Sequence, residues 1–423
     1  MAETAIVLEK KDPYSALKFT EFRSFLGMRM CITFGVQMQA VVMGWHIYQL
    51  THDPLSLGLI GLTEAVPALS IALFAGHIAD NQDRKKMLFF IILGQVVSTF
   101  ILLLITQPKI ALNYSVSIQI SVLYIMIFFN GIFRGFYSPT ASSMVALMLP
   151  RNIYANSTTW NSTGFQLAAI LGPAAGGLIF GFFGITSAFS VILVADILAF
   201  IFSRSLVSRK VEQIKKHETI LDSLKEGIRF VFKTKMMLSA LSLDLFSVFF
   251  GGAVALLPVF SQDILHVGPK GLGYLRAAPS IGALLAMLFM AYRSPTEKAW
   301  RNLLIAVLGF GLATLLFGFS KNFYLSLFAL FLTGIFDSIS VIVRSTIMQL
   351  LTPDELRGRV SAVNTMFIGS SNEIGAFESG FTARIMGGAV NSVLFGGSMV
   401  ILIVGYTYSK SKALFKVNLQ LQK

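Results

Sequence analysis

The sequence predicts an all-α membrane protein with twelve transmembrane helices in two six-helix, pseudo-symmetric bundles. Three observations lead to this fold class. The 423 residues are 55% hydrophobic and only 13% charged, with a mean hydropathy of +0.72. The apolar residues form twelve long stretches, and the two halves of the chain repeat one another. Soluble domains carry about 25% charged residues, so this composition indicates an apolar outside as well as an apolar core.

The remaining composition argues against several other classes of protein. Cys31 is the only cysteine, which excludes a disulfide framework and a cysteine-based zinc site. The five histidines lack metal-ligand spacing, and we predict neither a metal nor a cofactor. The net charge of +13 comes mostly from short loops between apolar spans, so nucleic acid is not an expected partner.

Apolar stretches of about 20 residues can cross the roughly 30 Å of bilayer hydrocarbon. The predicted spans are 22–50, 55–79, 87–106, 117–148, 153–181, 185–206, 237–264, 271–292, 301–319, 322–350, 356–387 and 389–409. Spans 153–181 and 356–387 are rich in Gly, Ser and Asn, which predicts close packing against other helices.

The longest polar segment divides the chain between the sixth and seventh spans. We predict an N-terminal six-helix bundle at 1–206, a cytoplasmic linker at 207–236 and a C-terminal six-helix bundle at 237–423. The linker's second half has the pattern of an amphipathic helix at the membrane interface. Its apolar face would hold Ile220, Leu221, Leu224, Ile228 and Val231, and its polar face Lys225, Glu226 and Arg229.

Basic residues predict the orientation of the spans. With both termini inside, the cytoplasmic segments and adjoining span ends hold 26 of the 34 Lys and Arg residues. The opposite loops hold only Lys109, Lys270 and Lys321. Because basic residues are in excess on the cytoplasmic side, we expect a multi-pass protein of the cytoplasmic (inner) membrane with both termini cytoplasmic, surrounded by membrane lipids.

The two halves of the chain repeat weakly. A shift of 203 residues matches Gly131, Ile132 and Phe133 to Gly334, Ile335 and Phe336. A shift of 212 residues matches Gly61, Ala65 and Pro67 to Gly273, Ala277 and Pro279. Such symmetry is typical of transporters that are built from two parallel six-helix halves.

The loop after the second span carries a motif with a basic cluster, GHIADNQDRKK from Gly76 to Lys86. It resembles the signature loop of the major facilitator superfamily, with its places filled by Gly76, Asp80, Asp83, Arg84, Lys85 and Lys86. Asp83 stands where many members have Gly. With an acid at this position, the loop resembles that of the branch of macrolide-efflux proteins and enterobactin exporters. Physically, the carboxylates and bases of this loop could form charge pairs that break when the cytoplasmic face opens. The alternative is a simple positive anchor.

The fifth predicted span contains LGPAAGG from Leu171, which is similar to the antiporter motif of drug exporters, although Ala168 stands where that motif prefers Gly. We interpret Gly172, Pro173, Gly176 and Gly177 as a bent, closely packed hinge against the other half. An ordinary packing seam of small residues would give the same pattern.

Charged residues inside the spans are the candidates for transport chemistry, because a charge at the bilayer centre costs about 2.5–3.5 kcal/mol. Arg134 and Asp337 are partners under the 203-residue shift, and Glu64 and Arg276 under the 212-residue shift. The resemblance implies that Arg134 and Asp337 face each other across a central cavity. Asp337 would then carry a proton, unless the two residues form a static ion pair.

Further candidates lie near these charges. Glu64 and Arg276 are more readily explained as structural. Glu373 and Glu378 could instead carry the proton or form helix–helix hydrogen bonds, and Phe136 and Tyr137 are weak candidates for substrate contact.

The resemblance implies a secondary transporter, and we expect a monomeric, proton-coupled exporter of a small amphipathic organic solute, a drug-like compound or a siderophore. Flipping of lysophospholipid is the alternative transport reading. A membrane enzyme or a non-transporting sensor fits less well. The sequence shows no nucleophile–base or metal grouping, and its longest loop is too short for a sensor domain.

Overall fold

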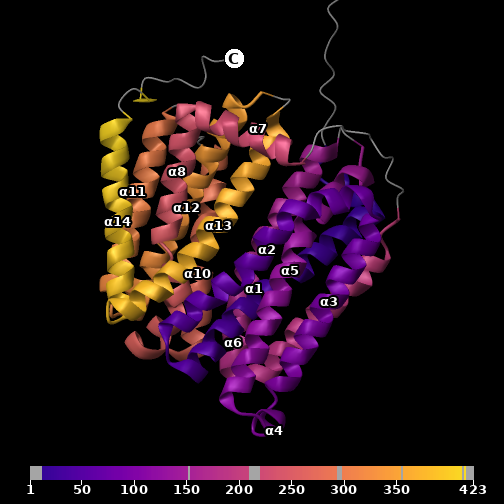
Figure 1. The fold of residues 1–423 in the computed structure, drawn as a ribbon, viewed down its shortest axis with the longest axis vertical. Coiled ribbons are helices and arrows are strands. Elements are labelled where there is room, and N and C mark those ends of the chain that lie inside the picture. The colour runs from indigo at the N-terminus through magenta and orange to yellow at the C-terminus, as the bar shows by residue number, and fades with distance from the viewer. Residues whose placement is uncertain are drawn as a thin grey trace, which may run out of the picture.

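The computed structural model of the chain describes residues 12–150, 153–208, 220–292, 298–353, 356–411 and 414–415. Within these ranges all the regular elements are helices, as the composition predicts. Figure 1 shows them in two bundles that lie side by side.

The first bundle holds the helices of the N-terminal half. They are η1 (Ala16–Lys18), α1 (Thr20–Thr51), α2 (Pro54–Asn81), α3 (Arg84–Ile105), α4 (Pro108–Ala111), α5 (Val116–Met148) and α6 (Tyr154–Arg204). Within α6, Gly184 is not helical, with φ 82° and ψ 176°. A glycine adopts this conformation without the strain a side chain would bring. Helix α6 therefore contains two spans, as the sequence predicts.

The second bundle begins with a broken helical run, α8 (Lys235–Phe250), η3 (Ala253–Leu256), α9 (Leu257–Val259) and η4 (Phe260–Ile264). It continues with α10 (Gly268–Tyr292), α11 (Ala299–Phe319), α12 (Phe323–Leu351), α13 (Arg357–Ile385) and α14 (Ala389–Lys410).

Ten of the described helical segments are long and apolar enough to cross a membrane, with α6 counted once. Because α6 is two helices joined at Gly184, it accounts for two crossings. The twelfth is α13, whose 29 residues are long enough but include Glu373 and Glu378 and many small polar residues. The chain is thus a twelve-helix membrane protein.

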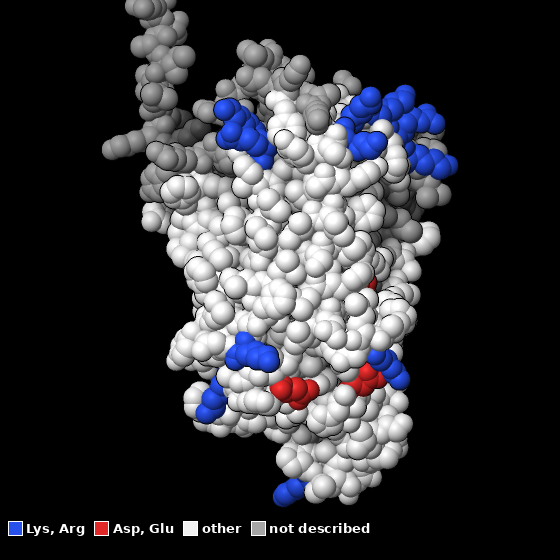
Figure 2. All heavy atoms as spheres, turned by 90° about the vertical axis from the view of Figure 1, so that its left-hand side faces the viewer, with Lys and Arg blue, Asp and Glu red and all other residues white. Residues whose placement is uncertain are grey.

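The outer surface supports this conclusion. Figure 2 shows a broad band of uncharged surface on the face of the second bundle, with groups of Lys and Arg at one end and both basic and acidic residues near the other. Large apolar side chains on α11, α12 and α14 are exposed, among them Ile305, Leu312, Phe328 and Leu402. A soluble protein would bury such a belt, whereas lipid solvates it.

The two bundles meet at one end and diverge toward the other. In Figure 1 they approach each other toward the end that carries α4, and they separate toward the end that carries α7, where the described part of α14 also ends. We call these the α4 end and the termini end. Helix α2 packs on α13, and the first half of α6 packs on α10.

Glycines at equivalent positions make these two junctions possible. A Cβ added to Gly177 of α6 would collide with the backbone of Gly273 on α10. A Cβ added to Gly380 of α13 would come within 2.7 Å of the Gly58 nitrogen on α2. Gly177 and Gly380 are partners under the 203-residue shift, so the repeat in the sequence corresponds to a repeated contact between the bundles.

The same symmetry holds inside each bundle. Gly131 of α5 presses against Pro67 of α2, and a Cβ there would lie 2.7 Å from the proline Cγ. Its repeat partner Gly334 of α12 presses against the backbone of Pro279 on α10. Both contacts join residues that the two sequence shifts relate, which supports two bundles of like construction.

The predicted amphipathic helix is present as α7 (Ile220–Lys233) and packs on α8 and α13. Val231 is buried in a cluster with Met237, Leu241 and Val360, whereas Ile228 is partly exposed. Lys225, Glu226 and Arg229 are exposed as predicted. The side chains of 220–224 lie outside the described part of the chain, as do residues 209–219 of the linker.

Candidate transport site

The charged centre of the molecule is a cluster of one base and two acids that joins the bundles. Nη1 of Arg134 on α5 lies 2.7 Å from Oε1 of Glu64 on α2. The same nitrogen lies 2.6 Å from Oε1 of Glu373 on α13. Glu64 and Arg134 belong to the first bundle and Glu373 to the second, so one guanidinium bridges the junction.

Close helix packing brings these three side chains together. Gly131, less than one turn before Arg134, lies against the backbone carbonyl of Glu64. Gly61, less than one turn before Glu64, lies against α13, where an added Cβ would be 2.9 Å from the carbonyl oxygen of Glu373. Since α5, α2 and α13 touch at glycines, their charged side chains reach one another across short gaps.

The cluster carries a formal charge of −1 when both acids are ionised. The side chain of Arg134 is 49% exposed, whereas Glu64 is 24% and Glu373 18% exposed. Arg134 is therefore reachable by a solute, while the two acids are more enclosed. Both hydrogen bonds are charge-assisted, and such bonds are shorter and stronger than neutral ones.

The expected pairing of Arg134 with Asp337 is absent from this structure. Arg134 points from α5 to α2 and α13, whereas Asp337 on α12 lines a cavity inside the second bundle with Asp244 of α8. The two residues occupy equivalent positions in the sequence repeat. Arg134, however, lies at the junction between the bundles, whereas Asp337 lies within the second bundle. Equivalent positions in two repeats need not face each other.

Glu64 bonds Arg134 rather than Arg276, its partner under the 212-residue shift. Arg276 on α10 has a buried Nε without a hydrogen-bond acceptor among the described residues. In the second bundle the ion pair joins Arg344 of α12 to Asp244 of α8, and both side chains are buried. The sequence shows the acidic and basic residues but not which acid pairs with which base.

The other predicted acids and aromatics lie apart from the Arg134 cluster. Glu378 on α13 is partly buried, and the hydroxyl of Ser379 lies 3.5 Å from its Oε2. Tyr137 packs in the apolar core of the first bundle, and Phe136 is partly buried beside it in the sequence. The contacts of Tyr137 indicate a packing role.

The signature loop is tied to its own bundle. Asp83 caps α3 by accepting from the backbone N–H groups of Lys85 and Lys86. It also accepts from the hydroxyl of Ser208, and the Lys85 ammonium donates to the carbonyl oxygen of Arg204 at the end of α6. The surroundings of Gly76 and the side chain of Asp80 lie outside the described part.

These contacts affect the ionisation of Asp83. Burial works to raise the pKa of its carboxyl. The hydrogen bonds from Ser208 and from the backbone at Lys86 and Lys85, together with the Lys86 charge, outweigh burial and lower the pKa below its ordinary value. Asp83 is therefore an ionised helix cap at neutral pH.

The predicted hinge residues divide between two partners. Gly172 and Gly176 pack on α1, where their added Cβ atoms would lie 2.9 Å from Phe34 O and 3.0 Å from Met38 O. Gly177 alone of these glycines packs on the other bundle, at Gly273. The expectation that all three glycines face the other half was too broad, because Gly172 and Gly176, four residues apart, share one face of α6, whereas Gly177 lies on another face. Pro173 lies within the described helix.

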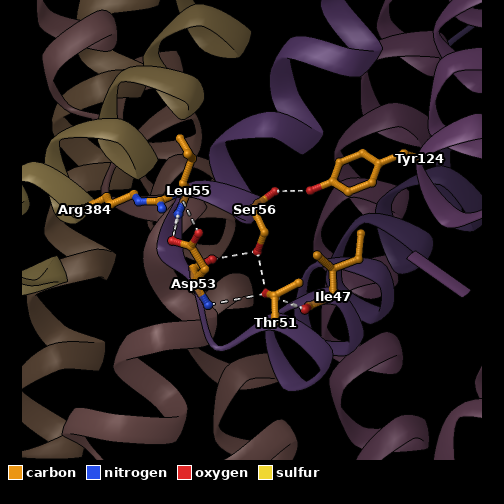
Figure 3. A network of polar contacts seen from close by, with 7 residues as sticks. All are labelled: Ile47, Thr51, Asp53, Leu55, Ser56, Tyr124 and Arg384. Carbon is orange, nitrogen blue, oxygen red and sulfur yellow. Dashed lines mark hydrogen bonds and ion pairs between the residues drawn. The ribbon is translucent and has the colours of Figure 1, made fainter. Parts of the chain in front are cut away.

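Polar contacts close the α4 end of the junction, and the sequence did not single them out. Figure 3 shows Asp53 at the start of α2 facing Arg384 near the end of α13, with Oδ2 and Nη1 3.0 Å apart. Asp53 also caps α2 by accepting from Leu55 N at 3.0 Å. Thr51 and Ser56 share a hydrogen bond of 2.8 Å, and the Tyr124 hydroxyl donates to Ser56 O. The network thus fixes the turn that presents Asp53 to Arg384.

Two further contacts lie at the same end. The Tyr48 hydroxyl of α1 donates to the carboxylate of Asp263 in η4, and the Lys270 ammonium lies 3.5 Å above the Phe182 ring centre. Asp53 could have been noticed as an Asp–Pro helix start. The partners of Arg384 and Asp263 could not, because they lie hundreds of residues away.

Breaking the pair between Asp53 and Arg384 is expected to favour opening of the α4 end. Asp53 and Arg384 are 35% and 58% exposed, so the pair contributes no more than about 1 kcal/mol. Ala376 of α13 packs against Gly61 of α2, where an added Cβ would lie 3.0 Å from the Cβ of Ala376. Arg384→Gln should therefore raise the labelling rate of a cysteine at Ala376, in a Cys31→Ser background, by roughly two- to fivefold.

The matched control is Lys321→Gln, an exposed lysine at the same end, which should leave the labelling rate of the Ala376 cysteine unchanged. Equal rates in Arg384→Gln and the control would show that the pair does not hold the junction closed.

The chain's family follows from the match of its sequence to known families. The sequence profile of the Major Facilitator Superfamily matches residues 25–376. This chain belongs to the Major Facilitator Superfamily. It is a transporter rather than an enzyme, and its relatives include a multidrug efflux pump and an enterobactin exporter.

Two named relatives are similar over most of their length. The chain is 24% identical to the multidrug efflux pump Tap of Mycolicibacterium fortuitum, over 86% of this chain and 89% of Tap. It is 21% identical to the enterobactin exporter EntS of Shigella flexneri, over 90% of this chain and 89% of EntS.

Solved structures of the superfamily share the fold. A bacterial homologue of the human lysosomal transporter Spinster, in an inward-facing conformation, superposes with a TM-score of 0.68 at 14% identity, covering 96% of this chain and 97% of the homologue. A POT family transporter bound to 5-aminolevulinic acid superposes with a TM-score of 0.72 at 12% identity, covering 94% and 96%. These likenesses establish the fold.

Proposed function

We propose that the protein is a proton-coupled exporter of an amphipathic organic solute, working by alternating access. One observation carries this proposal: the single guanidinium of Arg134 is bonded by a carboxylate from each bundle. An ion pair that spans the junction links the charge of its members to the separation of the bundles.

The coupling acid in this proposal is Glu373. With Glu373 ionised, its bond to Arg134 adds to the packing of α2 on α13 and keeps the α4 end closed. Protonation removes the negative charge and weakens the bond, while Glu64 keeps Arg134 on the first bundle. The proton therefore shifts the equilibrium toward separation at the α4 end.

This arrangement gives an exchange cycle. In the protein that holds neither solute nor proton, the ion pair prevents opening of the α4 end. The empty protein therefore does not cycle, and protons do not leak. A solute that enters from the termini end competes for the half-exposed Arg134 and replaces the bond to Glu373. After the solute leaves at the α4 end, a proton on Glu373 keeps the pair broken during the return. Its release at the termini end restores the pair.

The direction of transport depends on the orientation of the protein in the membrane. We propose that the termini end faces the cytoplasm. Exposed basic residues such as Lys225, Lys233 and Lys410 lie near the termini end, in line with the positive-inside rule. The bundles 1–206 and 237–423 would rock as bodies joined by the linker, with Asp80, Asp83 and Arg84 latching the termini end when it closes. We place this monomeric protein in the inner membrane.

The substrate class is supported by the relatives. Tap and EntS carry the names of a multidrug efflux pump and an enterobactin exporter. Both names describe export of organic molecules from bacteria, and this chain matches nearly the full length of each. A drug-like compound or a siderophore is therefore the substrate to test.

Transport by the purified protein in liposomes tests the proposal. A proton gradient with the acidic side at the α4 end should drive accumulation of a fluorescent drug or an iron-free siderophore at that end. A protonophore should abolish the accumulation but leave downhill exchange. Accumulation that is unaffected by the protonophore would show that protons do not drive the transporter.

A further inference from the structure

A second polar cluster lies inside the C-terminal bundle, apart from the Arg134 cluster. Helices α8, α11 and α12 enclose a small cavity, with room for about one water molecule. Its lining residues are Asp244, Ser247, Val248, Val307, Phe310, Asp337 and Ser340. Two carboxylates and two hydroxyls thus line a space that is otherwise apolar.

The charges around this cavity do not balance. Arg344 forms an ion pair with Asp244, and its side chain is only 2% exposed. No described residue donates a hydrogen bond to the carboxylate of Asp337 or forms an ion pair with it. Asp244, Arg344 and Asp337 together carry a formal charge of −1, and an unpaired charge at a partly buried position such as Asp337 is costly. A single positive charge in the cavity would relieve it.

Ser340 independently indicates a ligand. Its side chain is 4% exposed, and its buried Oγ has no hydrogen-bond partner among the described residues, although Ser340 lines the cavity. Buried hydroxyls are normally satisfied. Ser247 on the facing helix already donates its proton to Leu243 O, which leaves its oxygen available as an acceptor.

We propose that this cavity binds one sodium ion. Asp337 and Asp244 would supply carboxylate oxygens, and Ser340 and Ser247 hydroxyl oxygens, which are the ligands that hard cations prefer. A monovalent ion balances the charge of −1. Only two carboxylates line the cavity, and Arg344 already neutralises one of them, which argues against a multivalent ion.

The small size of the cavity also predicts that the site binds Na⁺ and Li⁺ in preference to K⁺. A space for about one water molecule admits Na⁺ or Li⁺ stripped of most of its water, whereas K⁺ is larger. Sodium would cross-link α8 to α12, and so stabilise the C-terminal bundle. This site does not depend on the role proposed for Glu373.

The test is a comparison of melting temperatures of the purified protein in NaCl and in choline chloride at equal ionic strength, together with equilibrium binding of radioactive sodium. Sodium should raise the melting temperature of the wild type by at least about 2 °C, because it binds the folded state. K⁺ and choline should not. Asp337→Asn should lose both the rise and the binding, and Ser340→Ala should weaken sodium binding about tenfold.

The matched control is Ser338→Ala, two residues away on α12, because Ser338 is equally buried but donates to Ala283 O. It should keep wild-type sodium affinity. The proposal is wrong if sodium and choline give equal melting temperatures in the wild type, or if Ser340→Ala and Asp337→Asn bind sodium as the wild type does. A melting temperature that depends on pH but not on sodium would equally overturn it, because the cavity would then hold only a proton.

Discussion

Replacing Arg134 with glutamine is expected to abolish proton-driven accumulation and to destabilise the protein. The change leaves the carboxylates of Glu64 and Glu373 facing each other without a cation between them. For a fully buried pair, loss of one partner costs about 3–5 kcal/mol. Here Arg134 is 49% exposed, so we expect about 1–2 kcal/mol, which fluorescence-detected melting in detergent can measure.

A compensating variant separates the charge effect from general damage. In Arg134→Gln combined with Glu64→Gln and Glu373→Gln, no stranded acid remains, so much of the lost stability should return while accumulation stays absent. Stability effects that simply add across the three positions would show that the groups do not interact.

Gly334→Val is expected to prevent normal folding of the C-terminal bundle. A Cβ at Gly334 would collide with the backbone of Pro279, which cannot move aside as a flexible side chain can. Overpacking typically costs about 1–3 kcal/mol, and a collision with the backbone should exceed that range. Gly131→Val should act alike in the first bundle, since its Cβ would meet the backbone of Glu64.

Gly405→Val is the matched control, because no atom lies within 4 Å of a Cβ at that exposed helical position. It should yield as much monodisperse protein in size-exclusion chromatography as the wild type. A similar yield from Gly334→Val would show that α10 and α12 are not packed as closely as described.

Local and repeated features of the fold could be predicted from the sequence. Hydropathy gave the twelve spans, and the break between the fifth and sixth fell at Gly184 as expected. The repeat pairing of Gly131 with Gly334 and of Pro67 with Pro279 recurs as packing contacts. These features depend on neighbouring residues or on internal comparison, which one sequence contains.

The choice of ionic partners could not be predicted in the same way. Arg134 and Asp337 are equivalent in the repeat, yet Arg134 bonds Glu64 and Glu373 while Asp337 lines a separate cavity. Which partner a charge meets depends on helix rotation and on which ends of the bundles touch. Neither quantity is present in the spacing of residues.

The most direct measurement is accumulation and exchange by Glu373→Gln in the same liposomes, with Glu378→Gln as the control on α13. Because glutamine cannot gain or lose the proton, Glu373→Gln should exchange solute down its gradient at a rate near that of the wild type but accumulate none against it. Glu378→Gln should do both. Full proton-driven accumulation by Glu373→Gln would contradict the assignment of Glu373 as the coupling acid.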